Sequence, residues 1–363
     1  MKNICDIIVL TWNQKQIIKS FIDSLFKSTS LPFRLIIIDN NSKDGTREYL
    51  ESIKKDNVKI IFNKENRGFV GGMNQGIEIS DAPYVCLANN DLIFTKGWLE
   101  EIIFIFENYP KVGILNPDSN SLGAKPPEDV SIEEFAETLK INNKGIFLEM
   151  PFCIGFCMCI RREVIERIGK LSEDFAPIFF EDTDYSMRAK SAGYLIGVAK
   201  GSYVWHKEHA SFKQIKEREA IFQRNRNIFI KKWGKILRIA WISTDYNELK
   251  NNLKNAIDFA RQGNFIFFFF KGFKLERSRI FEEIDSFEHT GIIFLRFKNI
   301  FDLAFKIIKK KKKYDVIFGP YRIIKRLKFL RLFYKSYFVN QEDKNKVLNI
   351  YKKIKYENSV NFK

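Results

Sequence analysis

Short apolar runs alternate with segments of helical spacing over the first 115 residues, and no other feature of this 363-residue chain restricts its fold as much. Each run is short enough for a buried strand, and the segments between them repeat apolar residues every three or four positions. Strands separated by short helices predict an α/β fold, a mostly parallel sheet with helices on both faces. We expect strands at 4–10, 33–38, 58–62 and 84–88, and helices at 16–27, 47–55 and 69–79.

The same alternation restarts after Gly234, which is a plausible helix end. Residues 116–150 are polar and proline-containing, so we expect them to be irregular, and we expect the last 40 residues to be helical and basic. The pattern predicts two domains, residues 1–235 and residues 236–363, the second a smaller α/β unit. Further strands are expected at 194–198, 203–205, 236–242, 265–270, 291–297 and 315–318.

Positive charge is concentrated in the second of these parts. Residues 1–240 carry 34 Lys+Arg and 31 Asp+Glu, a net charge of +3, whereas residues 241–363 carry 27 and 13, a net of +14. A basic third of a chain favours an anionic partner such as a membrane surface, an acidic polymer or nucleic acid, and a solvated lysine-rich face is the simpler alternative. The sequence has no RNP, zinc-finger or helix-turn-helix signature, so we do not expect nucleic acid.

Neither a membrane span nor a signal peptide is visible. The apolar run 265–270 has six residues, where a spanning helix needs about 20. The five cysteines fit no C-x-x-C metal or redox spacing, and a reducing cytoplasm suits them best.

Polar residues follow two of the expected strands, where ligands bind in parallel sheets. Thr11 and Asn13 follow the first strand, and Asp39 to Asn41 end the second. A buried carboxylate such as Asp39 could accept a hydrogen bond from a pyrimidine ring N–H. Aspartate and asparagine also favour ordinary turns, so the pattern alone leaves both interpretations open.

A glycine-rich segment begins at Asn66-Arg67-Gly68 and continues through Asn74 to Gly76. It fits neither a P-loop nor the G-x-G-x-x-G pattern. Its simplest role is a close backbone approach to a nucleotide.

Asn89-Asn90-Asp91 follows the fourth expected strand. Hard cations prefer oxygen ligands, so Asp91 could hold a divalent cation beside a diphosphate, with Asn89 offering an amide oxygen. His206, one of only three histidines, could be a further ligand of Mn²⁺. A plain turn and a structural histidine are the simpler alternatives.

Glu181 and Asp182 follow two phenylalanines and open an expected helix. Acidic residues in a first helical turn are ordinary partners of the helix dipole. A carboxylate there could instead act as a general base that removes the proton of an attacking hydroxyl group.

Taken in order along residues 1–235, these segments resemble the family 2 glycosyltransferases of GT-A fold, notably bacterial rhamnosyltransferase-like members. The matching segments are 7–13, 39–46, 66–76, 87–91, 155–162, 180–193, 206–211 and 224–225. The resemblance implies an inverting hexosyltransferase of polysaccharide biosynthesis. It would move a hexose or deoxyhexose from a UDP- or dTDP-sugar to a glycan, lipid-linked or protein acceptor.

The resemblance also implies residue roles. Asp39 would bind the base, and Asn89-Asn90-Asp91 stands where the family carries its D-x-D motif for Mg²⁺ or Mn²⁺. Asp182 would be the general base with Glu181 positioning the acceptor, and His206 would approach the metal or diphosphate. Asn89 replaces the first aspartate of that motif and removes one negative charge.

The second part more faintly resembles the acceptor-side half of a GT-B Rossmann domain, without its donor-binding half. We expect a cytoplasmic enzyme with peripheral membrane contact through this basic part. The competing hypothesis, motivated by Asn89, is a non-catalytic protein that binds a nucleotide-sugar or glycan on a degenerate transferase fold.

Overall fold

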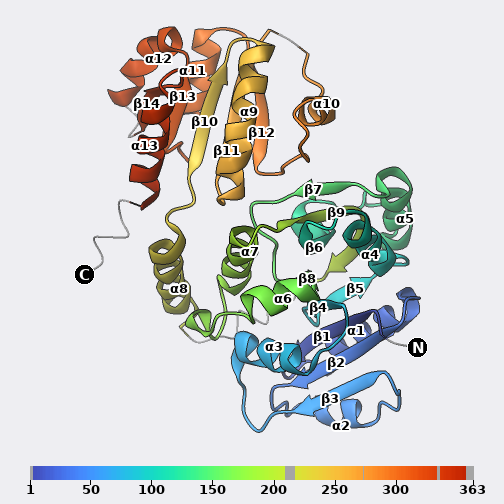
Figure 1. The fold of residues 1–363 in the computed structure, drawn as a ribbon. Helices are drawn as coiled ribbons and strands as arrows, with labels where there is room; N and C mark the ends of the chain where they lie inside the picture. The colour runs from blue at the N-terminus through green and yellow to red at the C-terminus, as the bar shows by residue number, and fades with distance from the viewer. Residues whose placement is uncertain (1–2, 209–216, 273, 333–335, 357–363) are drawn as a thin grey trace. The chain divides into compact units, whose positions relative to one another are not determined.

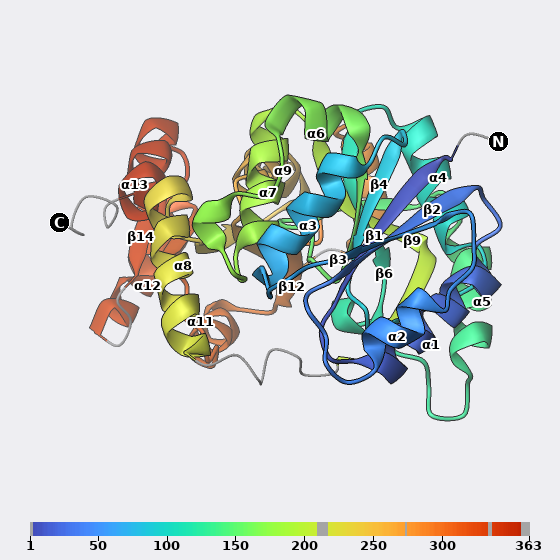
Figure 2. The same cartoon turned by 90° about the horizontal axis from the view of Figure 1, so that it is seen from below.

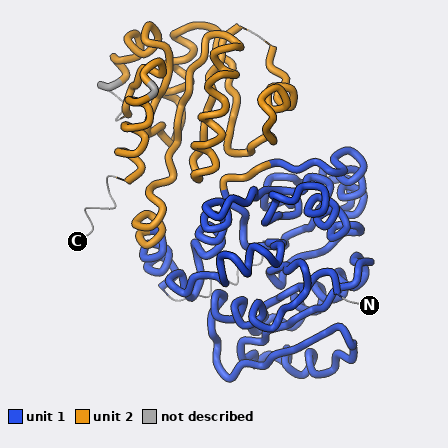
Figure 3. The backbone as a smooth tube through the Cα atoms, in the orientation of Figure 1, with its two compact units in different colours: residues 1–148, 152–226 blue, residues 149–151, 227–363 orange. Residues whose placement is uncertain are grey.

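The computed structural model describes residues 3–208, 217–272, 274–332 and 336–356. The chain forms two compact units, shown in Figure 3. Unit 1 comprises residues 1–148 and 152–226, and unit 2 comprises residues 149–151 and 227–363. The expected domain boundary at residue 235 stays a prediction. No helix in the described part of the chain has both the length and the apolar character needed to cross a membrane.

Unit 1 is built on a mixed sheet in the order β3-β2-β1-β4-β8-β6-β9-β5, with β7 paired to β9 (Figure 1). The first four strands along the chain pair in parallel, as their alternation with helices predicts, and β6 is parallel to β9. Antiparallel pairs involve β8 and β5. The strands are β1 (Cys5–Thr11), β2 (Phe33–Asp39), β3 (Val58–Phe62), β4 (Tyr84–Ala88), β5 (Leu92–Phe94), β6 (Val112–Asp118), β7 (Phe147–Glu149), β8 (Cys157–Arg161) and β9 (Leu195–His206).

Helix α1 of unit 1 buries one apolar side. In α1 the buried side chains recur at the spacing of one helical face, from Ile18 to Leu25. The glycines of α3 allow that helix to lie close to β1: an added Cβ at Gly72 would be 2.3 Å from Leu10 Cδ1, and one at Gly76 would be 2.3 Å from Ile8 Cγ2. Figure 2 shows α3 beside the parallel strands. The helices are α1 (Lys15–Ser28), α2 (Thr46–Glu51), α3 (Gly68–Ile79), α4 (Trp98–Asn108), α5 (Ile132–Asn143), α6 (Arg162–Ile168) and α7 (Glu181–Ser191). Helix α8 (Arg218–Trp233) begins in unit 1 and ends in unit 2.

Two expectations for unit 1 were wrong in part. Residues 116–150 contain α5, which begins at a capping box in which Ser131 accepts from the backbone N–H of Glu134 and the Glu134 carboxylate accepts from that of Ser131. The two strands expected at 194–198 and 203–205 form the single strand β9, whose pairing with β6 shifts register between Pro117 and Asp118.

Unit 2 contains a parallel sheet in the order β12-β11-β10-β13-β14, an arrangement typical of doubly wound folds. Helices α9 and α13 pack on one face, and α11 and α12 pack on the other. The strands are β10 (Arg238–Ser243), β11 (Phe265–Lys271), β12 (Ile292–Phe297), β13 (Val316–Gly319) and β14 (Tyr337–Asn340), and the helices are α9 (Tyr246–Arg261), α10 (Arg277–Glu282), α11 (Ile300–Ile308), α12 (Tyr321–Leu327) and α13 (Lys344–Tyr356).

The sequence predicts every strand of unit 2 except β14. That four-residue strand falls in the stretch expected to be helical, and it pairs in parallel with β13. The short segment Glu149–Pro151 also belongs to unit 2. There Glu149 forms a bridge with His289, and its carboxylate accepts two hydrogen bonds from the Arg261 guanidinium, at 2.6 and 2.8 Å.

Candidate active site

The carboxyl ends of β1, β2 and β4 meet at one edge of the unit 1 sheet. Thr11 is the Cα partner of Asp39, and the chain of β4 leads directly to Asn89. The side-chain amide of Asn90 donates to Thr11 Oγ1 at 3.4 Å and to Gln14 Oε1 at 2.7 Å. The structure therefore brings together three segments that the sequence predicted would line one edge.

Asp39 is fully buried at this edge. Its Oδ2 accepts from the backbone N–H of Ser42 at 3.2 Å. Its Oδ1 is buried and has no hydrogen-bond partner among the described residues. A buried carboxylate oxygen without a donor is costly, so this atom fits a ligand that brings an N–H group.

Two asparagines follow the strand ends in left-handed backbone conformations. Asn13 has φ of 51° and Asn41 has φ of 64°, a region that asparagine tolerates better than most residues. The backbone N–H of Asn13 donates to Ser42 Oγ at 2.9 Å, and its Oδ1 accepts from the backbone N–H of Lys43 at 2.6 Å. These bonds fix the two loops against each other.

Asn63 is a functional-site candidate that the sequence interpretation missed, and Asn40 had no role of its own there. Asn40 donates to Asn66 Oδ1 at 3.1 Å and accepts from the Asn63 amide at 2.8 Å. Through Asn66, which accepts from the backbone N–H of Gly68, this network joins the end of β2 to the start of α3. Only the frequency of asparagine in these loops hinted at it.

Two glycines of the glycine-rich segment pack against the sheet. Gly72 and Gly76 lie against side chains of β1 and do not face an open site. Asn74 is buried, donating to the carbonyl oxygen of Leu171 at 2.9 Å and accepting from its N–H at 3.0 Å. The structure does not bring Asn74 to the strand edge, whereas Arg67 is exposed just before α3.

Asp91 and His206 meet because β5 pairs with the end of β9. Asp91 Oδ1 lies 3.0 Å from His206 Nε2, and both side chains are largely buried. The other ring nitrogen, Nδ1, is 2.8 Å from Ser121 Oγ, and Phe156 stacks on the ring. Ser121 lies 85 residues from His206, so nothing local in the sequence indicated it.

This pair suits a divalent cation. Two ligand atoms at adjacent corners of an octahedron are about 3 Å apart when each is about 2.1 Å from the ion, and Mg²⁺ and Mn²⁺ accept such donors. The Asp91–His206 separation of 3.0 Å is compatible with that spacing, and it is also the distance of a direct hydrogen bond between the two side chains. Ser121 Oγ binds the ring nitrogen that faces away from Asp91, which is the kind of support that orients metal-binding histidines.

Glu181 and Asp182 open α7 after Phe179 and Phe180, whose φ angles of 79° and 70° are unusual for bulky residues. Asp182 Oδ2 accepts from the backbone N–H of Gly155 at 2.9 Å, and its Oδ1 accepts from Thr183 N–H at 2.6 Å and Thr183 Oγ1 at 3.0 Å. Burial raises the pKa of Asp182, and the hydrogen bonds, which lower it, offset only part of that effect.

Glu181 is in a less polar setting. Burial, and then the charge of neighbouring Asp182, raise the pKa of Glu181 to about 8. Its Oε2 is buried without a hydrogen-bond partner in the described structure. Near neutral pH Glu181 is therefore mostly protonated and can donate a hydrogen bond, whereas the hydrogen bonds from Gly155 and Thr183 favour the ionised form of Asp182.

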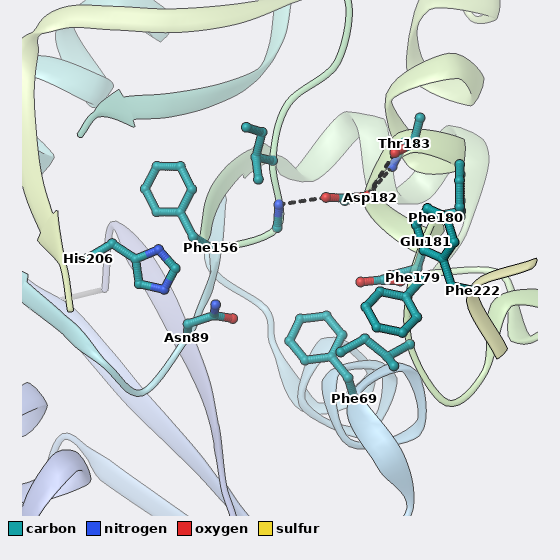
Figure 4. Close-up of a pocket in the computed structure, with 13 residues that line it drawn as sticks. Phe69, Asn89, Phe156, Phe179, Phe180, Glu181, Asp182, Thr183, His206 and Phe222 are labelled. Atoms are coloured by element: carbon teal, nitrogen blue, oxygen red, sulfur yellow. Dashed lines mark hydrogen bonds between the residues drawn. The ribbon is translucent and has the colours of Figure 1, made fainter. Parts of the chain in front are cut away.

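One pocket of about 300 Å³ joins these groups. Figure 4 shows His206 and Asn89 on one side and Glu181 and Asp182 on the other. Phenylalanine rings fill the walls between them, at positions 69, 156, 179, 180 and 222. The pocket thus has polar side chains at one end, two carboxyls at the other and aromatic rings between them.

Residues 6–169, most of the parallel sheet and the first strand-end loops, match the family model described as glycosyl transferase family 2. These residues form a family 2 glycosyl transferase domain. The resemblance to the family 2 glycosyltransferases is confirmed, as is the α/β fold class, whereas the fainter GT-B resemblance of the second part stays a prediction. Of the matching segment 206–211, residues 209–211 lie outside the described residues.

Relatives of this glycosyl transferase domain carry related names. An uncharacterized glycosyltransferase of Haemophilus influenzae is 33% identical over 103 residues, covering 28% of this chain and 32% of that protein. N-acetylglucosaminyl-diphospho-decaprenol L-rhamnosyltransferase of Mycobacterium tuberculosis is 21% identical over 266 residues, 63% of this chain and 85% of the relative. The O-antigen chain rhamnosyltransferase WbaN of Salmonella anatum is 27% identical over 196 residues, 52% and 61% of the two chains.

The chain spans less than two thirds of the length of several of these relatives. Among solved structures, a mannosyltransferase of Pyrobaculum calidifontis in complex with GDP-Man and Mn²⁺ has a TM-score of 0.47 at 18% identity, with 64% of each chain covered. GalNAc-T7 with UDP, GalNAc and Mn²⁺ has a TM-score of 0.48 at 12% identity, covering 63% of this chain and 50% of that one. The bound groups named there belong to those proteins.

Proposed function

We propose that this chain is an inverting glycosyltransferase that moves a hexose or deoxyhexose from a UDP- or dTDP-sugar to a glycan, lipid-linked or protein acceptor. The observation that carries the proposal is the single pocket in which Asn89 and His206 face Glu181 and Asp182. A transferase needs both a site for a departing diphosphate and a base for the attacking hydroxyl. The family of the N-terminal unit supports glycosyl transfer in general.

In this proposal the donor lies along the strand-end edge. Asp39 Oδ1, buried without a protein donor, accepts from a pyrimidine ring N–H. Thr11, Asn13 and Asn41 line the same edge, with Arg67 and Gly68 at the start of α3. Asn89 and Asn90 then lie beside the diphosphate.

Asp91 and His206 would hold a divalent cation, Mg²⁺ or Mn²⁺. Such a cation neutralises charge that develops on a departing diphosphate. Asn89 contributes no charge to this group, so the site carries one negative charge fewer than one with two aspartates. Ser121 would keep the His206 ring in place.

Asp182 acts as the general base in the proposed reaction. Its carboxylate takes the proton of the acceptor hydroxyl as the hydroxyl oxygen attacks the anomeric carbon on the face opposite the departing diphosphate, which inverts that carbon. The hydrogen bonds from Gly155 and Thr183 fix the orientation of the carboxylate. Glu181, protonated near neutral pH, donates a hydrogen bond that positions the acceptor.

The test is transfer from UDP- and dTDP-sugars in the presence of Mg²⁺ or Mn²⁺, compared among variants. We expect Asp182→Asn to lower kcat by roughly 10²- to 10⁴-fold, the usual contribution of a general base. Asp174→Asn, which alters an exposed carboxylate a few residues before α7, should keep full activity. Turnover of Asp182→Asn at the level of the native protein would refute the assignment of the base.

Asn89 favours one alternative, a non-catalytic protein that binds a nucleotide-sugar or glycan. The amide of Asn89 lines the pocket where an aspartate would strengthen cation binding. Calorimetry that showed tight donor binding, with no product from a broad acceptor panel, would support this alternative. The paired carboxyls of α7 weigh against it, because binding alone does not need a base.

A further inference from the structure

Helix α11 presents an apolar side to solvent. Phe301 is 82% exposed and Phe305 is 60% exposed, and Ile308 is also exposed one turn later. The opposite side of the helix, with Leu303, packs into the core of unit 2. Side chains at positions i, i+4 and i+7 of a helix are neighbours on one side, so these three form a continuous apolar stripe.

Positive charge surrounds this stripe. The lysine run 309–313 follows α11 directly, and Lys309 Nζ lies 5.5 Å from the centre of the Phe305 ring. Between residues 296 and 330 the chain carries 12 Lys+Arg and 2 Asp+Glu. The two acids are engaged locally: Asp302 accepts from Lys298 N–H and Lys306, and Asp315 accepts from the N–H of Arg238.

Helix α12 extends the surface. Its buried residues Ile324 and Leu327 pack into the same core cluster as those of α11, so both helices cover one face of the unit 2 sheet. The outward side of α12 has Tyr321 and basic residues, and Phe329 follows it, 52% exposed. We define the α11–α12 face by its exposed residues: Phe301, Phe305, Ile308, Lys309, Lys311, Lys312, Lys313, Tyr321, Arg322, Lys325, Arg326, Lys328 and Phe329.

We propose that the α11–α12 face binds an anionic phospholipid surface. Phenyl rings fit the boundary between headgroups and acyl chains, and lysines beside them are attracted to anionic headgroups. Stable peripheral binding needs two such signals, and this face has both. The proposal does not depend on transferase activity.

Other occupants fit less well. A second copy of the same face would place its lysines against these lysines, which is repulsive. A nucleic acid or acidic polymer would use the charges, but it would leave a stripe of two phenylalanines and an isoleucine without purpose. The combination of an apolar stripe and a cationic border favours a lipid interface.

The experiment is sedimentation of the full chain with vesicles of phosphatidylglycerol and phosphatidylcholine, and with vesicles of phosphatidylcholine alone. We expect binding to the anionic vesicles only. Phe301→Ser combined with Phe305→Ser should weaken the partition at least roughly tenfold. Lys309→Gln, Lys311→Gln and Lys312→Gln together should weaken it by roughly a hundredfold at low salt.

Two controls alter an exposed apolar side chain and three lysines elsewhere in the chain. Ile141→Ser removes an exposed apolar side chain from α5 in unit 1, and Lys346→Gln, Lys352→Gln and Lys353→Gln remove three lysines from α13 on the other face of the unit 2 sheet. Both controls should bind within about twofold of the native protein. Circular dichroism and melting temperature confirm that each variant is folded.

Insertion is tested separately with Phe301→Trp. Lipids brominated on their acyl chains should quench its additional fluorescence if the ring enters the bilayer. Absence of vesicle binding at low salt would refute the proposal. It would also be refuted if the phenylalanine variant bound vesicles as well as the native protein and the native protein preferred a soluble polyanion to vesicles. Formation of a dimer that the phenylalanine variant abolishes would refute it as well.

Discussion

Neighbouring residues in this chain can differ sharply in chemistry. Glu181 and Asp182 are adjacent, yet hydrogen bonds to Gly155 and Thr183 stabilise the charge of Asp182, while the Oε2 atom of Glu181 is buried without a partner among the described residues. The difference arises from where the helix begins: Phe180 is the last residue before α7, and the side chain of Glu181 turns into the apolar wall. A protonated and an ionised carboxyl side by side can serve as hydrogen-bond donor and acceptor at the same pH.

Glu181 also predicts a pH dependence of stability. An unfolded glutamate has a pKa of about 4.3, whereas the folded pKa is about 8. Between these values the folded state retains a proton that the unfolded state has lost, so the contribution of Glu181 to the free energy of unfolding falls as pH rises. Glu181→Gln should therefore be more stable than the native protein by roughly 2–4 kcal/mol at pH above about 8.

Urea unfolding at several pH values measures this difference. The advantage of Glu181→Gln should disappear near pH 4, where both states of the native protein carry the proton. Glu173→Gln, an exposed glutamate, should show no such trend. A difference independent of pH would contradict the buried, protonated state of Glu181.

At the scale of elements, the glycines of α3 look like a ligand-binding motif in the sequence, but in the structure they allow the helix to pack on the sheet. Gly72 and Gly76 lie one turn apart on the side that faces β1, and each leaves room for a side chain of that strand. A glycine every four residues in a helix beside a sheet thus allows close packing. The cost in helix propensity is small compared with the clash that it avoids.

Gly76→Ala should destabilise unit 1. Its Cβ would lie 2.3 Å from Ile8 Cγ2 on a buried strand, so α3 must move or Ile8 must change rotamer, at about 1–3 kcal/mol. Gly71→Ala in the same helix meets only the Arg67 side chain at 3.2 Å and should be neutral or slightly stabilising. The denaturation midpoints of the two variants test this, and equal midpoints would show that α3 has room at both positions.

The elements most accessible to prediction were those with local signals. Periodicity predicts β1 to β4 and α1 to α3, and capping chemistry at Ser131 and Glu134 could have predicted α5. Strand β14 and the antiparallel pairs of β8 depend on contacts between distant segments, which periodicity does not record. The same distinction applies to the site residues. Asp91 and Asp182 lie in recognisable sequence patterns and could be predicted, whereas Ser121 meets His206 only in the folded structure.

At the scale of the whole molecule, all cysteines share the same environment, the protein interior. All five are free and buried. The fold brings Cys86, Cys157 and Cys159 within 4.8 Å of one another on β4 and β8, although their spacing in the sequence fits no known pattern. Cys153 lies apart, with its thiol near the carbonyl oxygens of Ile114 and Gly197.

This burial predicts a global readout of unfolding. A thiol reagent such as Ellman's should react with no cysteine of the native protein on the timescale of seconds, because access requires opening of the sheet core. In guanidinium all five should react at once. A fast phase in the native protein would locate an open segment, and its position can be found by replacing single cysteines with serine.

The segment Glu149–Pro151 has a consequence for synthesis on the ribosome. Its residues are made early, yet Arg261 and His289, which bind Glu149, follow 112 and 140 residues later. At roughly 5–20 residues per second, Glu149 waits about 6–20 seconds for Arg261. During that interval β8 and β9, the last two strands of the unit 1 sheet, are made, while the Glu149 carboxylate still lacks the Arg261 guanidinium. A chaperone or a transient water-exposed conformation has that window in which to act.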